Sequence, residues 1–224
     1  MQLGVREGHA IWSATYDEAP NPLLELEKRT VLPWLPKLDG KTFVDVACGT
    51  GRWASFAAQQ GADVFGADFS APMLARAATG RAAGTRFVQA DALQLSFPDG
   101  LADFSVCAFA AGYMKSPAQL IAELRRITCP GGQIMVTDIH PTAIASGWRR
   151  SFRRAGETYE IDNWAHPIAD YLSAARAHGL KVQHIAEASF GEPERPIFRA
   201  CGREPSFAGM CMIPALFAAL WRLP

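Results

Sequence analysis

Short apolar runs alternate with helical patterns along most of the chain. The runs TFVDVA, DVFGAD, TRFVQA, DFSVCAF and QIMVTDI are rich in apolar residues, as is typical of strands covered on both faces. Between them, apolar residues three or four positions apart indicate helices, and the clearest stripe contains Leu120, Ile121 and Leu124. This alternation predicts a doubly wound α/β domain with a seven-stranded, mostly parallel sheet.

Local signals set the ends of the predicted helices. We predict helices over residues 51–60, 72–83, 116–127 and 167–178, the second capped by Ser70 and the third ended by a Pro-Gly-Gly turn. A further strand, LKVQHIAEASF, is followed by a turn and by PIFRACG. These two segments are close enough in the sequence to predict a terminal antiparallel hairpin.

Three segments lie outside this alternation. Residues 1–40 predict an irregular helical arm, and residues 141–165 predict an inserted substrate cover within an α/β domain that spans residues 41–205. Four arginines of the insertion could bind an anionic substrate or form a solvated helix face: Arg149, Arg150, Arg153 and Arg154. Residues 206–224 are mostly apolar but shorter than a membrane-spanning helix, so we expect no stable membrane insertion. This segment is expected to pack on the domain or to form a homodimer contact.

A glycine-rich sequence follows the first predicted strand. Gly49-x-Gly51-x-x-Ala54 matches the dinucleotide fingerprint, and Asp68 lies 17 residues beyond Gly51, where an acid would bind a ribose. An NAD(P)-dependent oxidoreductase is therefore one hypothesis. Asp45 favours another, because a carboxylate beside the loop would repel a pyrophosphate and attract the ammonium and sulfonium groups of S-adenosylmethionine (SAM).

Composition narrows the range of partners. The 224 residues include 22 acidic and 22 basic side chains, so the bulk charge does not indicate nucleic-acid binding. Five scattered cysteines favour reduced thiols over a disulfide framework or a zinc site, and we expect no bound metal. The N-terminal residues lack the pattern of a signal peptide, so a cytoplasmic protein is expected.

Four motifs in order resemble the class I SAM-dependent methyltransferases, particularly the small-molecule branch typified by ubiquinone/menaquinone methyltransferases. VDVACGTG resembles the glycine motif, and GADFSAPML resembles the acid of the second strand with its following Ser and Met-Leu. VQADALQLSFPDGLADFSV resembles the third acid and the fourth strand, and LIAELRRITCPGGQIMVTD resembles the last helix, turn and strand of the match. The resemblance covers about residues 40–140. It implies a Rossmann-like fold, SAM as cofactor and S-adenosylhomocysteine (SAH) as product.

The resemblance also implies a role for each matching residue. Asp45 and the backbone of Gly49 and Gly51 would hold the methionine end of SAM, and Asp68 would accept hydrogen bonds from the ribose hydroxyls. The other implied cofactor contacts are Phe69, Met73, Asp91, Ala92, Phe109 and Tyr16. Helix capping is the alternative role for Asp68 and Asp91, and packing is the alternative for Met73 and Tyr16.

Candidate catalytic groups lie after the fourth and fifth strands. Tyr113 follows the fourth strand, His140 ends the fifth, and His166 lies next to the helix that begins near Pro167. For both histidines a structural role in a turn or at a helix end is the alternative, and His9 is interpreted as a surface or terminal residue.

These residues predict a SAM-dependent methyltransferase that acts on an oxygen or nitrogen atom of a small, hydrophobic or aromatic molecule. An Asn/Asp-Pro-Pro-Tyr motif is missing after the fourth strand, which argues against DNA bases and protein glutamine as acceptors. The alternatives are an NAD(P)-dependent oxidoreductase and a SAM-binding protein without methyl transfer.

Overall fold

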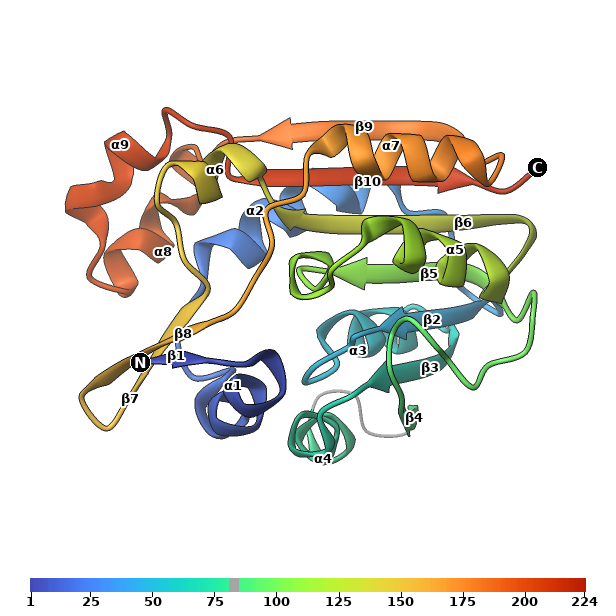
Figure 1. Cartoon of the computed structure of the whole chain (residues 1–224), viewed down its shortest axis with the longest axis horizontal. Helices are drawn as coiled ribbons and strands as arrows, with labels where there is room; N and C mark the ends of the chain where they lie inside the picture. The colour runs from blue at the N-terminus through green and yellow to red at the C-terminus, as the bar shows by residue number, and fades with distance from the viewer. Residues whose placement is uncertain (81–84) are drawn as a thin grey trace.

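A twisted sheet runs through the centre of the computed structural model, which describes residues 1–80 and 85–224. Within these residues the sheet has seven strands in the order β4-β3-β2-β5-β6-β10-β9 (Figure 1). The strands are β2 (Thr42–Val46), β3 (Asp63–Asp68), β4 (Arg86–Gln89), β5 (Ala102–Ala108), β6 (Thr128–Ile139), β9 (Lys181–Ala188) and β10 (Leu216–Arg222). Strands β2 to β6 are parallel, and β10 is antiparallel to both of its neighbours. The predicted fold class is confirmed.

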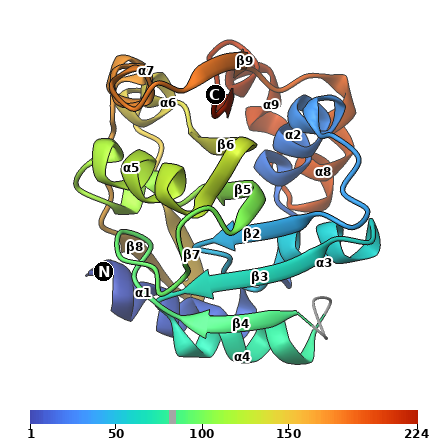
Figure 2. The ribbon, with the colours of Figure 1, turned by 90° about the vertical axis from the view of Figure 1, so that its right-hand side faces the viewer.

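Helices cover both faces of this sheet. The helices α5 (Pro117–Ile127) and α7 (Ile168–Ala177) lie on one face, and α2 (Pro22–Val31), α3 (Arg52–Gln59) and α8 (Arg195–Ala200) lie on the other (Figure 2). Proline occupies the first turn of α2 and α5, where its fixed φ suits the helix and its missing N–H has no intrahelical partner to lose.

The helix predicted over residues 72–83 is α4 (Ala71–Thr79), which packs beside β3 and β4. Gly80 follows its last residue, and residues 81–83 of the prediction lie outside the described residues. The predicted helices at 51–60, 116–127 and 167–178 correspond to α3, α5 and α7 within a residue at each end.

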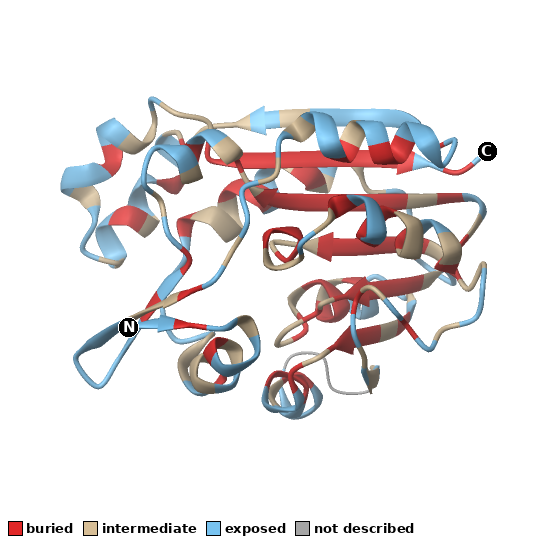
Figure 3. Cartoon of the chain, in the orientation of Figure 1, coloured by how far each residue is buried: buried red, intermediate tan, exposed pale blue. Residues whose placement is uncertain are grey.

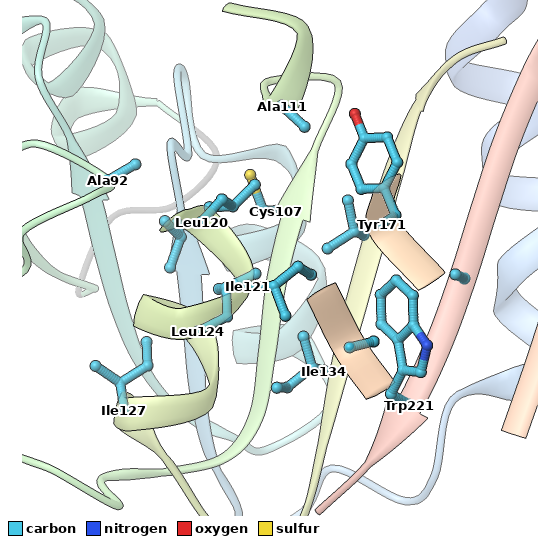
Figure 4. Packing of buried hydrophobic residues seen from close by; sticks show 14 of the residues in the cluster. Ala92, Cys107, Ala111, Leu120, Ile121, Leu124, Ile127, Ile134, Tyr171 and Trp221 are labelled. Carbon is cyan, nitrogen blue, oxygen red and sulfur yellow. The ribbon is translucent and has the colours of Figure 1, made fainter. Parts of the chain in front are cut away.

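Side chains from α5, α7 and the central strands form one of the two large core clusters. Leu120, Ile121 and Leu124 on α5 pack with Ile134 on β6 and with Trp221 on β10 (Figure 4). All five side chains are completely or almost completely shielded from solvent. The apolar stripe that indicated a helix is therefore the surface that joins α5 to the sheet.

The C-terminal residues form a strand inside the sheet, which corrects two predictions. The expected hairpin strand PIFRACG is instead part of α8, and β10 is the antiparallel partner of β9. Residues 206–224 were expected outside the sheet, yet β10 lies between β6 and β9 and is buried along nearly its whole length (Figure 3). Its side chains alternate between the two core clusters, so the apolar run is explained by burial on both faces. None of the described helices is long and apolar enough to cross a membrane.

A smaller sheet lies beside the carboxyl ends of the parallel strands. It has the order β1-β8-β7 and joins the N-terminal β1 (Gln2–Leu3) to the hairpin of β7 (Ser151–Arg154) and β8 (Glu157–Ile161). Helix α1 (Val5–Trp12) packs on it, and the Trp12 ring stacks on the Phe152 ring at a centroid distance of 5.1 Å. We call β1, α1 and residues 150–161, which contain β7 and β8, the cover.

One of the two interpretations placed the arginines of the insertion on a solvated helix face. The structure does not place them on a helix. Arg153 and Arg154 are exposed on the β7–β8 hairpin, and Arg149 is exposed just before it. Arg150 is buried. The hairpin explains why an aromatic and arginine-rich segment alternates between buried and exposed positions, since successive strand residues point to opposite faces.

Candidate active site

A cavity of about 400 Å³ lies where the cover meets the carboxyl ends of β2, β3, β4 and β5. This is the edge at which open α/β sheets bind ligands. Trp164, from the chain after β8, forms part of the wall. The sequence-predicted residues that line the cavity are Tyr16, Gly49, Asp68, Phe69, Met73, Asp91, Ala92, Phe109 and Tyr113. Asp45, Gly51, His140 and His166 do not line it.

The backbone is left-handed at two of the strand ends that face the cavity. After β2, Ala47 has φ 56° and Gly49 has φ 54°, and after β5, Phe109 has φ 55°. Such conformations cost about 1–3 kcal/mol for residues other than glycine and are concentrated at functional sites. Gly49 adopts its left-handed backbone without this cost, and a Cβ atom added there would meet nothing within 4 Å, so the loop is open at this position.

Asp45 lies beneath the glycine loop and is 2% exposed. Its Oδ2 accepts a hydrogen bond of 2.9 Å from the N–H of Ala54 in the first turn of α3, and Gly51 is the N-cap of that helix. Burial raises the pKa of Asp45 to about 7, against the opposing effect of the hydrogen bond from Ala54. Asp45 therefore supports the loop from below, and its contact with the methionine end of a cofactor remains a prediction.

The raised pKa of Asp45 predicts a pH-dependent stability. The native state binds more protons than the unfolded state between an ordinary pKa of about 3.9 and the folded value of about 7. The contribution of Asp45 to stability is thus fully present below about pH 4 and is lost as the pH rises through 7. Relative to Asp45→Asn, the wild-type free energy of unfolding should fall over this window by at most about 1.4 kcal/mol per pH unit. Urea unfolding of both proteins between pH 4.5 and 8 measures the difference, and a difference independent of pH would contradict the raised pKa.

Asp68 joins two loops at the cavity. Its Oδ2 accepts a hydrogen bond from the N–H of Gly49, and its Oδ1 accepts one from the N–H of Ser70, both at 2.8 Å. Burial raises the pKa of Asp68, while these two hydrogen bonds and nearby His9 act in the opposite direction. A carboxylate has about four lone-pair sites, so both oxygens can still accept from a ligand. Asp68 thus holds the turn before α4, whose N-cap is Ser70, and lines the cavity at the same time.

The other predicted acid, Asp91, follows β4 and is exposed. Its Oδ1 accepts a hydrogen bond of 2.9 Å from the N–H of Leu93. No helix begins directly after Asp91 in the described residues, so this bond closes a local turn and is not the helix cap of the alternative interpretation. The residue also lines the cavity. Met73 is fully buried and contributes to the wall beside Phe69.

An arginine from the cover reaches the core of the site. Arg150 forms a buried ion pair with Asp138 at the end of β6 and donates a 2.7 Å hydrogen bond to the carbonyl oxygen of Phe109. Its guanidinium lies 4.4 Å from the centre of the Tyr113 ring. Burial raises the pKa of the Tyr113 hydroxyl, against the opposing effects of the Arg150 charge and of a hydrogen bond from Arg150. The sequence contained no signal that distinguished Arg150 from the arginines around it.

The two histidines predicted as catalytic lie outside the cavity lining. His140 Nε2 is 2.8 Å from Glu187 Oε2, and its Nδ1 accepts a hydrogen bond from the N–H of Thr142, which caps α6 (Pro141–Ala145). His166 Nε2 is 2.8 Å from the carbonyl oxygen of Met114. Both rings are thus engaged in the structural contacts that were the alternative interpretation. Among the described residues, no cluster of three or more His, Cys, Asp or Glu side chains is placed to hold a metal ion.

His9 lies near the N-terminus, and it lines the cavity, a position that its interpretation as a surface or terminal residue did not include. Its ring meets the Tyr113 ring edge-on at a centroid distance of 4.7 Å. Val5, His9 and Trp12 are three or four residues apart on α1, so they lie on one face of this helix. This spacing could have indicated that His9 shares a face with apolar residues.

Comparison with known proteins agrees with this geometry. Residues 44–136 match the family described as "Methyltransferase domain". Demethylmenaquinone methyltransferase of Thermus thermophilus is 41% identical over 106 residues, or 45% of this chain and 48% of that protein. Malonyl-[acyl-carrier protein] O-methyltransferase of Pectobacterium atrosepticum is 32% identical over 54% of this chain and 48% of that protein. The chain spans about half the length of the curated relatives it matches.

Among solved structures, an S-adenosylmethionine dependent methyltransferase from Mesorhizobium loti superimposes with a TM-score of 0.72. The match covers 90% of this chain and 100% of that chain at 24% identity, so it shows a common fold. The sequence match of residues 44–136 and this common fold make the chain similar to the class I SAM-dependent methyltransferases.

Proposed function

We propose that this chain transfers the methyl group of SAM to an oxygen or nitrogen atom of a small, hydrophobic or aromatic molecule. The observation that carries the proposal is the Asp68 carboxylate, which lines the cavity at the end of β3. Its oxygens are held in place by backbone N–H groups and can accept two ribose hydroxyls. The relatives named above act on demethylmenaquinone and on a malonyl-[acyl-carrier protein], which supports a methyltransferase with a small acceptor group.

The remaining lining residues fit the other parts of SAM. Phe69 and Met73 supply an apolar wall beside Asp68, suited to adenine, and the open backbone at Gly49 lies at the end suited to methionine. A cavity of about 400 Å³ is within the range that binds one small molecule. When bound there, SAM supplies an electrophilic methyl group on a sulfonium.

The chain's own residues would bind the acceptor, exclude water and align the reacting atoms. Phe109, Tyr113 and Trp164 provide aromatic surface on the cavity wall, and Tyr113 is available as a hydrogen-bond donor. These rings support an aromatic acceptor. Within residues 206–224, β10 lies between two strands of the sheet, so a homodimer contact is proposed only for the residues before it, where Met212 is exposed. The cytoplasmic location remains a prediction.

Calorimetry with SAM, SAH and NAD⁺ tests the cofactor assignment. We expect binding of SAM and SAH and no binding of NAD⁺. Incubation with SAM and a panel of phenols, carboxylic acids and amines, with SAH measured as product, then tests methyl transfer. Binding of NAD⁺ without SAM would support the oxidoreductase, and SAM binding without SAH formation from any acceptor would support a protein that only binds the cofactor.

A further inference from the structure

His9 lines the cavity from the side of the cover. It lies on α1 of the cover, and its ring meets Phe69, just beyond β3, and Tyr113, which follows β5, at centroid distances of 5.7 and 4.7 Å. Strands β3 and β5 are the two neighbours of β2 in the sheet. His9 therefore lies between two parts of the cavity. One is the proposed ribose site at Asp68, and the other is the aromatic wall proposed for the acceptor.

The hydrogen bonds of His9 define which nitrogen carries the proton. Nδ1 lies 2.8 Å from the carbonyl oxygen of Val5, one turn earlier on α1. A carbonyl oxygen can only accept, so Nδ1 donates, and Nε2 of the neutral ring carries a lone pair. In the part of the chain that the structure describes, Nε2 has no hydrogen-bond partner, in contrast to His140 and His166.

The surroundings keep this ring neutral. Burial lowers the pKa of His9, and the positive charge of Arg150 acts in the same direction, while Asp68 and the bond to Val5 oppose them. The other titratable groups on the same cavity are Arg6, Tyr16, Asp91, Tyr113 and Lys115. A neutral imidazole with a free Nε2 is the form that accepts a proton.

We infer that His9 is a catalytic residue, a general base that takes the proton from a neutral hydroxyl acceptor such as a phenol. The inference rests on the proposed methyl transfer and narrows its substrate class. The acceptor O–H proton passes to Nε2, and the oxygen electron pair forms the new bond to the methyl carbon. The carbon–sulfur bond breaks, its electron pair stays on sulfur, and the imidazolium then releases its proton to water. A carboxylate acceptor needs no such base.

The first test needs no activity. Long-range ¹H–¹⁵N NMR of the histidine rings in the full chain reports the tautomer and the titration of each ring, and His9→Gln identifies the His9 signal by its loss. We expect the Nδ1–H tautomer at pH 7 and a pKa below the ordinary value of about 6.5. A protonated ring at pH 7, or an Nε2–H tautomer, would overturn the inference.

The second test compares 2-naphthol with 2-naphthoate, which have the same ring system but differ in their need for a base. His9→Gln keeps a donor for Val5, and it should lower kcat for 2-naphthol about 10²–10⁴-fold. Turnover of 2-naphthoate and the Kd for SAH should change far less than kcat for 2-naphthol, because a carboxylate acceptor needs no base. The control is His184→Gln, because the His184 ring stacks on Trp34 away from the cavity. This variant should change kcat for neither 2-naphthol nor 2-naphthoate.

The pH profile separates catalysis from cofactor binding. For wild type, kcat with 2-naphthol should fall tenfold per pH unit below the His9 pKa measured by NMR, and this dependence should disappear in His9→Gln. Equal kcat values for the two proteins, or a loss confined to the Kd for SAH, would refute the inference while leaving methyl transfer intact. A wild-type chain that binds no SAM would instead contradict the proposed function.

Discussion

Replacing Arg150 by methionine should lower the free energy of unfolding by about 3–5 kcal/mol, the typical cost of breaking a buried ion pair by removing one partner. The side chains of Arg150 and Asp138 are 6% and 5% exposed, so water cannot replace the lost guanidinium. The carbonyl oxygen of Phe109 would also lose its donor. Urea unfolding at pH 7, followed by circular dichroism, measures the change.

Two further variants show whether the buried charge is the cause. Arg149→Met removes the neighbouring arginine, which is exposed, and should change stability by less than about 0.5 kcal/mol. The double variant Arg150→Met/Asp138→Asn removes both charges and keeps an acceptor for the N–H of Gly112, so it should recover most of the loss. If the loss of stability in the double variant equals the sum of the losses in Arg150→Met and in Asp138→Asn alone, the ion pair is not the main cause of the loss.

Asp68→Ala should weaken SAH binding by about 1–3 kcal/mol, or roughly 5–150-fold, because a charge-assisted hydrogen-bonding group is lost. The same change removes the acceptor that the N–H groups of Gly49 and Ser70 share, so some loss of stability is also expected. Calorimetry at a temperature at which the variant remains folded measures the affinity.

Asp63→Ala provides the matched control for Asp68→Ala. Asp63 begins β3 and Asp68 ends it, but Asp63 is exposed and forms a surface ion pair with Arg86. Its replacement should leave SAH binding unchanged and alter stability by less than about 1 kcal/mol. Unchanged affinity in a folded Asp68→Ala protein would refute the ribose assignment.

Local sequence patterns predicted most of the sheet and its helices. The run DVFGAD is β3 over the same six residues, and the stripe of Leu120, Ile121 and Leu124 is the buried side of α5. These predictions are correct because the periods of strands and helices are properties of consecutive residues. The prediction of a strand over PIFRACG was wrong because a short apolar run fits a strand or a helix equally well. Here Pro196 lies in the first turn of a helix.

The candidate site was predictable where it depends on strand ends. Gly49 follows one predicted strand and Asp68 ends the next, and parallel strands bring their carboxyl ends to one side of the sheet, so both residues line the cavity. His140 also ends a strand, yet its side chain binds Glu187 on β9. A strand end alone does not determine which way a side chain turns or which neighbour binds it.

The sequence by itself determined the α/β class, the methyltransferase resemblance and the sheet edge that bears the cavity. The glycine loop, the acids and the strand periods that carry this information lie close together along the chain. Only the tertiary structure decided that β10 completes the sheet and that His9 and Arg150, from opposite parts of the cover, meet at Tyr113. Those contacts join residues far apart in the sequence, and they form because folding brings apolar rings and opposite charges together out of water.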